Sequence, residues 1–100
     1  MTMIPQGQNL FIVDLTYTVP FDQVEPHLDA HMAFIAELTA NGILLAAGRK
    51  EPRTGGIILA TAPSLESLRD RMERDPFATT GVASFRITEF VPNTRHPGFE

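Results

Sequence analysis

The order of strand-like and helix-like apolar segments constrains the fold of this chain more than any other feature of its sequence. Branched and aromatic residues gather in short runs that are typical of strands, at 10–18, 43–48, 56–61 and 83–91. Between these runs, apolar residues recur at the 3.6-residue spacing of a helix, at 27–41 and 64–75. Ser64 is a good N-cap for the second helix. The residues that this spacing places against the core are Leu28, Met32, Ile35 and Leu38 in the first helix, and Leu65, Leu68 and Met72 in the second. The predicted order is therefore strand, helix, strand, strand, helix, strand.

With right-handed crossovers, this order predicts an α+β fold of the ferredoxin-like βαββαβ type, in which two helices cover one face of a four-stranded antiparallel sheet. The segments 10–18 and 56–61 carry near-continuous apolar runs, so we expect them in the middle of the sheet. The segment 83–91 alternates apolar and polar residues and is expected at an edge. Apolar residues left on the second face predict a partner, and a second copy of the chain, giving a homodimer, is the simplest one.

Composition limits the classes of function. We expect a single domain over 1–100, with a loosely ordered leader at 1–8 and a C-terminal arm at 92–100 whose Arg95 and His96 have no assigned role. The net charge of -4 and the dispersed Lys and Arg argue against a nucleic-acid partner. No apolar run approaches about 18 residues, so we expect no membrane span. We also expect no signal peptide, so the default location is cytoplasmic.

Asp75 and His31 are the candidate pair for chemistry. Asp75 follows an amphipathic run and precedes Pro76, which predicts the end of a helix, where a carboxylate needs a cationic or hydrogen-bonding partner. Alternatively, Asp75 is a turn residue whose side chain bonds the backbone two positions on. His31 lies on or beside the apolar face of the first helix. It is either the partner of Asp75 or a histidine at the edge of the core whose nitrogens bond the backbone.

Several motifs together resemble a known family. The segments Ala30-His31-Met32, 42–48 and Asp75-Pro76-Phe77, with Gly81 four residues later, look like the YCII-related proteins of the dimeric α+β barrel superfamily, over about 9–91. The resemblance implies that His31 and Asp75 form the active-site pair. Neighbouring families include muconolactone isomerases and cofactor-free monooxygenases that act on ring compounds. Many members have a proline soon after the position of Gly48, where this chain has Arg49.

A histidine paired with an aspartate suits proton transfer. Histidine takes or gives a proton near neutral pH, and an aspartate bonded to its other nitrogen fixes the tautomer and stabilises the imidazolium. We therefore expect a small enzyme of lyase or isomerase type that needs no cofactor and acts on a small, ring-containing or anionic substrate. The alternative is a non-catalytic ligand-binding or dimerisation module of the same fold.

The remaining polar residues give weaker candidates. One long loop carries Arg49, Lys50 and Arg53, and these cations either hold an anionic substrate group at the mouth of a pocket or are simply solvated. Arg49 is the candidate substrate-binding residue among them. Phe77 and Thr79 adjoin Asp75 and are candidates for substrate contact, although Thr79 equally suits a turn cap. His27 has the i, i+4 spacing to His31, but two ligands on one helix do not make a metal site, so no metal is expected.

Overall fold

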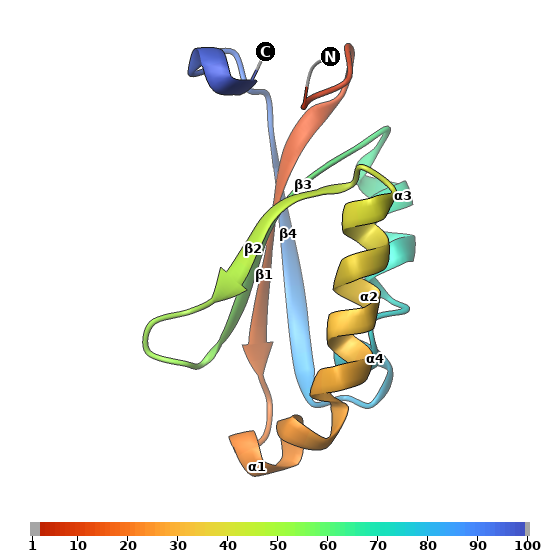
Figure 1. The fold of residues 1–100 in the computed structure, drawn as a ribbon, viewed down its shortest axis with the longest axis vertical. Helices are drawn as coiled ribbons and strands as arrows, with labels where there is room; N and C mark the ends of the chain where they lie inside the picture. Colours follow the sequence, from red (N-terminus) through yellow and green to blue (C-terminus); the bar gives the residue numbers. More distant parts are fainter. Residues whose placement is uncertain (1–2, 100) are drawn as a thin grey trace.

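The computed structural model describes residues 3–99, which form a sheet covered on one face by helices (Figure 1). The strands β1 (Asn9–Tyr17), β2 (Leu44–Arg49), β3 (Gly55–Ala62) and β4 (Ala83–Phe90) are antiparallel and lie in the order β2-β3-β1-β4. The main helices are α2 (Leu28–Ala40) and α3 (Leu65–Met72). The predicted ferredoxin-like order, with the first and third strands in the middle and the fourth at an edge, is confirmed.

Short helical turns complete the chain. They are α1 (Phe21–Val24), the 3-10 turn η1 (Glu25–His27), α4 (Pro76–Thr79) and the 3-10 turn η2 (Pro97–Phe99). The helix α3 begins as its sequence predicts, because the Ser64 side chain accepts a hydrogen bond of 3.1 Å from the Ser67 N–H. After α2, Gly42 has a φ of 75°, a left-handed conformation that glycine adopts without strain. No helix within residues 3–99 is long and apolar enough to cross a membrane.

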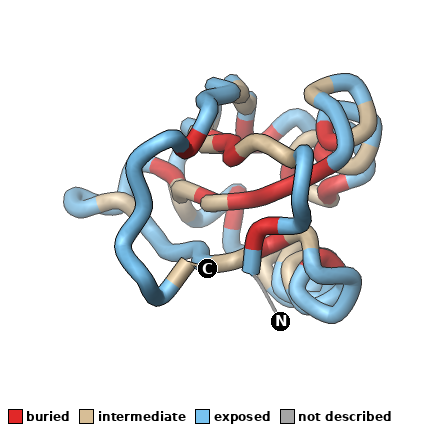
Figure 2. The backbone as a smooth tube through the Cα atoms, turned by 90° about the horizontal axis from the view of Figure 1, so that it is seen from above, coloured by how far each residue is buried: buried red, intermediate tan, exposed pale blue. Residues whose placement is uncertain are grey.

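The hydrophobic core lies between the helices and one face of the sheet, where the buried positions of the strands gather (Figure 2). Phe11, Val13 and Leu15 alternate along β1 toward this core, and all three are buried. From the helices, Leu68 and Met72 of α3 complete the packing, as the spacing of the second helix predicts. The intervening side chains of β1 therefore point to the opposite face.

The opposite face of the sheet is apolar in part and is only partly buried. Ile12 of β1 pairs in register with Leu59 of β3, so the two side chains share this open face. Both have intermediate exposure, whereas their neighbours on the helix side are buried. Phe90, at the end of β4 on the same face, is 40% exposed. The homodimer stays a prediction, and the open face is the surface it would use.

The expectation of a loosely ordered leader is wrong for the part of it that the structure describes. Met1 and Thr2 lie outside the described residues. Ile4 is 2% exposed, and the Gln8 N–H donates to the Pro5 carbonyl at 3.1 Å. Burial of the Ile4 side chain holds this segment against the domain. The polar, glycine-containing composition of the segment did not indicate this contact.

Candidate functional site

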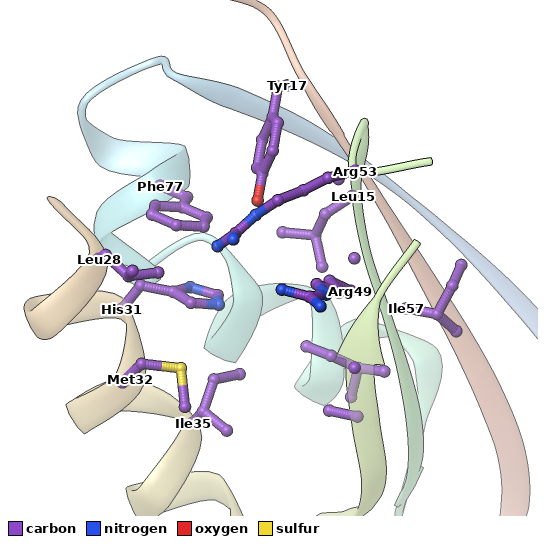
Figure 3. A pocket seen from close by; sticks show the side chains of 15 residues that line it. Leu15, Tyr17, Leu28, His31, Met32, Ile35, Arg49, Arg53, Ile57 and Phe77 are labelled. Atoms are coloured by element: carbon purple, nitrogen blue, oxygen red, sulfur yellow. The ribbon is translucent and has the colours of Figure 1, made fainter. Parts of the chain in front are cut away.

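A pocket of about 270 Å³ opens between α2 and the edge of the sheet that β2 and β3 form (Figure 3). Most of its wall is apolar, and its large apolar side chains are Leu15, Leu28, Met32, Ile35, Ile58 and Phe77. Ligand sites are commonly somewhat larger, about 300–1,000 Å³, so this pocket suits a compact molecule. Met32, which its spacing placed in the core, is 52% exposed and belongs to this wall instead.

Small residues on the helix side of the sheet create the space. Ala47 of β2 pairs with Ile58, and Gly56 of β3 pairs with Leu15, so both small residues share the face beneath α2. No bulky side chain therefore fills this end of the core. Gly55 next to them has a φ of 159°, and a Cβ there would lie 1.8 Å from the Leu15 carbonyl oxygen. A glycine is required at that position to let β1 and β3 approach.

His31 stands on the pocket wall with its inner nitrogen held by Asp75. The Nδ1 of His31 lies 2.8 Å from Oδ1 of Asp75, across 44 positions of sequence, so the predicted contact is present. An ionised carboxylate only accepts hydrogen bonds, so the His31 Nδ1–H donates. The His31 side chain is 13% exposed and that of Asp75 is 0% exposed. The arrangement leaves Nε2 as the ring nitrogen free to meet a ligand.

The prediction that Asp75 ends a helix is wrong. The helix α3 ends at Met72, and Asp75 is the N-cap of α4, where its Oδ1 accepts a 2.9 Å hydrogen bond from the Phe77 N–H. Pro76 starts α4 because the first helical position needs no N–H. A helix N-terminus favours an anion, so the backbone stabilises the carboxylate that the sequence placed unfavourably. Both interpretations of Asp75 from the sequence are therefore correct. Its Oδ1 bonds the backbone two positions on and also the His31 ring.

The second oxygen of Asp75 is buried and has no hydrogen-bond partner among the described residues. The carboxylate is therefore shielded from solvent, with Oδ1 alone serving His31 and the cap of α4. Charge interactions are stronger in such low-dielectric surroundings than at the surface. A positive charge that forms on the His31 ring would be stabilised directly.

Aromatic rings fix the plane of His31. The Phe77 ring stacks on the imidazole with centroids 3.8 Å apart and planes 1° from parallel. Tyr17, in turn, meets Phe77 edge to face, with centroids 6.1 Å apart. The sequence analysis missed Tyr17, although it lies two positions beyond Leu15 and so shares the face of the sheet beneath α2. Phe77 and Tyr17 both line the pocket.

The three cationic side chains of the predicted loop, Arg49, Lys50 and Arg53, do not all lie at the pocket. Arg49 and Arg53 line the pocket. Lys50 turns to the open face of the sheet instead, where its Nζ lies 2.6 Å from Oδ1 of Asp14. Arg49 lies 3.5 Å from Glu51 through its Nε, and its side chain is 62% exposed. The structure therefore brings two arginines, and not three cations, to the pocket.

Thr79 and His27 are not among the residues that line the pocket. Thr79 is the last residue of α4, and its hydroxyl donates to the Pro76 carbonyl at 3.4 Å, the turn-capping role that the sequence left open. His27 lies in η1, before α2 begins. Of the candidates from the sequence, the structure gathers His31, Asp75, Phe77 and Arg49 at one place.

The fold and this pocket define a class of small α+β proteins in which a histidine, held by a buried aspartate behind it, lies on the wall of a compact cavity. The family model of the YCII-related domain matches residues 9–91, and the chain belongs to this family. No curated protein matches the sequence.

Among solved structures, the chain is similar to 5-chloro-2-hydroxyhydroquinone dehydrochlorinase (TftG) from Burkholderia phenoliruptrix AC1100, in complex with 2,5-dihydroxybenzoquinone. The TM-score is 0.70 at 21% sequence identity, and the match covers 81% of this chain and 92% of that one. At this identity the likeness shows the fold, and the chemistry has to be argued from the residues of this chain.

Proposed function

We propose that this protein is a small lyase or isomerase that needs no cofactor, in which His31 moves a proton on a bound substrate and Asp75 holds and orients the His31 ring. One observation carries the proposal. The His31 Nδ1 lies 2.8 Å from a fully buried carboxylate, while the same ring lines a compact, mostly apolar pocket. A histidine that is oriented by a carboxylate and faces a cavity has the geometry of a general acid–base group.

The proposed mechanism uses both ring nitrogens. The Nδ1–H bond to Asp75 leaves Nε2 without a proton, so Nε2 acts as the base toward an acidic O–H or C–H of the substrate. The ring is then an imidazolium beside the Asp75 carboxylate, which stabilises it. Return of the proton to another substrate atom completes an isomerisation, and return of the proton to a departing group completes an elimination.

The lining of the pocket favours a ring compound with a polar substituent. Apolar side chains and Phe77 suit a planar ring, and the two arginines on the pocket wall, Arg49 and Arg53, suit an anionic group. The similar dehydrochlorinase supports a small-molecule lyase, since its structure was determined with 2,5-dihydroxybenzoquinone. We propose substrates of this size and polarity.

A second candidate function is a non-catalytic small-ligand-binding module. It is favoured by the cap that Asp75 provides to α4, which gives the carboxylate a structural role without any chemistry. The two candidates differ in one respect, because only an acid–base enzyme depends on the proton-accepting nitrogen of His31.

Proton exchange on a ring probe tests the proposal. The ring hydrogens of 2,5-dihydroxybenzoquinone exchange with solvent through a keto tautomer, so their loss in heavy water is followed by proton NMR. We expect the wild-type protein to bind this probe and to accelerate the exchange well above the uncatalysed rate. Binding without any acceleration would favour the binding module.

We also propose that the open face of the sheet pairs with the same face of a second copy. The face carries Ile12, Leu59 and Phe90, which no helix of the described chain covers (Figure 1). Replacing Ile12 with aspartate should raise the dimer dissociation constant by about 100-fold or more, because burying an unpaired carboxylate costs several kcal/mol. Sedimentation equilibrium measures this constant.

The matched control for this prediction is Ala36→Asp, which places the same charge on an exposed position of α2. This variant should dimerise as the wild type does. A wild-type protein that stays monomeric at micromolar concentration would contradict the proposed dimer.

A further inference from the structure

We propose that Arg53 and Tyr17 form an anion-binding pair that selects substrates with an ionised oxygen on the ring, and that Arg53, not Arg49, is the main cation of the pocket. The inference deepens the proposed function and rests on it for the identity of the pocket. It names two residues for the recognition of the substrate that motif and family resemblance do not assign.

Arg53 carries a charge that has no anionic partner among residues 3–99. Its guanidinium carbon lies 4.2 Å from the centroid of the Phe21 ring, a cation–π contact that holds the side chain in place. The ion pairs within residues 3–99 involve His31, Arg49 and Lys50, and none involves Arg53. Arg53 lines the pocket, so a ligand anion would be its first charged partner.

The backbone around Arg53 is tied down on both sides. The carbonyl of Thr54 accepts a 2.9 Å hydrogen bond from the Tyr17 N–H, and the Thr54 N–H donates to the Pro52 carbonyl at 2.8 Å. The Lys50 N–H donates to the Gly55 carbonyl at 3.0 Å, which closes the base of the loop. A guanidinium on a fixed backbone loses less conformational freedom when it binds an anion.

Tyr17 adds a second donor at the same place. Its ring packs against Phe21, with centroids 6.0 Å apart, and edge-on against Phe77. Figure 3 shows its hydroxyl pointing toward the side chain of Arg53. The hydroxyl makes no hydrogen bond within the described part of the chain, so its proton is available to a ligand. A phenol O–H and a guanidinium are both strong donors to an ionised oxygen.

Arg49 is the weaker candidate of the two arginines. Its Nε lies 3.5 Å from Glu51, and the two side chains are 62% and 82% exposed. Water and salt screen an exposed ion pair of this kind, so Glu51 holds Arg49 only weakly. Arg53 is exposed as well, but its guanidinium is held against the Phe21 ring. No aspartate or glutamate within residues 3–99 lines the pocket, so no acidic side chain on the pocket wall neutralises the charge of Arg53.

These observations define the ligand class as a compact planar ring with an ionised hydroxyl, such as an enolate or a phenolate. The apolar wall accommodates the ring, and the oxygen anion meets Arg53 and Tyr17. His31 then remains free for proton transfer. A neutral ring of the same size would occupy the same wall without the charge-assisted hydrogen bonds.

Isothermal titration calorimetry with two matched probes tests the inference. The probes are 2,5-dihydroxybenzoquinone, whose hydroxyls ionise, and 2,5-dimethylbenzoquinone, which has the same pattern and no ionisable group. We expect the wild type to prefer the first probe by about tenfold or more. Arg53→Gln should remove most of that preference, and Tyr17→Phe should reduce it by about threefold.

Arg69→Gln, which removes the same charge from an exposed position of α3 outside the pocket, is the matched control and should change the preference by less than about twofold. Arg49→Gln should lower the preference less than Arg53→Gln does. Unchanged binding of the dimethyl probe to Arg53→Gln shows that the variant is folded. A wild type without preference, or a preference lost in Arg49→Gln and kept in Arg53→Gln, overturns the inference. An Arg53-dependent preference without proton exchange supports the inference and contradicts the proposed enzyme, so the two failures are distinguishable.

Discussion

Replacing His31 with asparagine should lower the rate of ring-hydrogen exchange on 2,5-dihydroxybenzoquinone by about 10²–10⁴-fold, the usual contribution of a general acid–base group. Asparagine keeps a polar side chain on the pocket wall but cannot take up a proton. The affinity for the probe should change far less than the rate, because Arg53 and the apolar wall remain. Exchange followed by NMR gives the rate, and calorimetry gives the affinity.

His27→Asn is the matched control for this result. His27 lies in η1, one turn before His31, and it does not line the pocket. The exchange rate of this variant should equal that of the wild type. A His31→Asn protein that exchanges the ring hydrogens at the wild-type rate would remove His31 from the mechanism.

Replacing Asp75 with alanine should lower the free energy of unfolding by about 2–4 kcal/mol, the largest effect on stability that we expect from any residue of the candidate site. The substitution leaves both the His31 Nδ1–H and the Phe77 N–H without their acceptor in a buried place. It also removes the cap of α4. Urea denaturation followed by circular dichroism measures the change.

Asp75→Asn separates the structural role of this residue from its chemical role. The amide oxygen still accepts from Phe77, so the stability loss should be smaller, about 1–2 kcal/mol. The neutral amide no longer stabilises an imidazolium, so the exchange rate should fall as it does in His31→Asn. Asp70→Ala, on an exposed position of α3, is the control and should stay within about 0.5 kcal/mol of the wild type. Equal stability of Asp75→Ala and Asp70→Ala would contradict the burial of the carboxylate.

Much of the fold could be predicted from the sequence, because apolar spacing reports which faces of each element are buried. The sequence does not show which face of β1 is covered by the helices. Phe11 and Ile12 are both apolar, so the sequence could not decide which one faces the helices. Only the pairing of β1 with both neighbours places Phe11 in the core and Ile12 on the open face.

The site was harder to predict, because its geometry depends on contacts between distant segments. Local sequence preferences predict a helix end at Asp75-Pro76. In the structure Pro76 instead begins α4, and Asp75 is the N-cap of that helix. Spacing also placed Met32 in the core, because a helical stripe does not reveal where Ala47 and Gly56 leave a space beneath it. The long loop was recognised, but which of its cations turns inward depends on Phe21 and Asp14.

The proposed mechanism requires that Asp75 holds the His31 Nδ1–H, so that an unprotonated Nε2 faces the pocket. The nitrogen-15 chemical shifts of the His31 ring, measured at a pH where imidazole is neutral, report directly which nitrogen carries the proton. We expect the Nδ1–H tautomer in the wild type and a loss of that preference in Asp75→Asn. A neutral His31 ring with its proton on Nε2 in the wild type would show that Asp75 does not set the tautomer, and the proposed mechanism would be wrong.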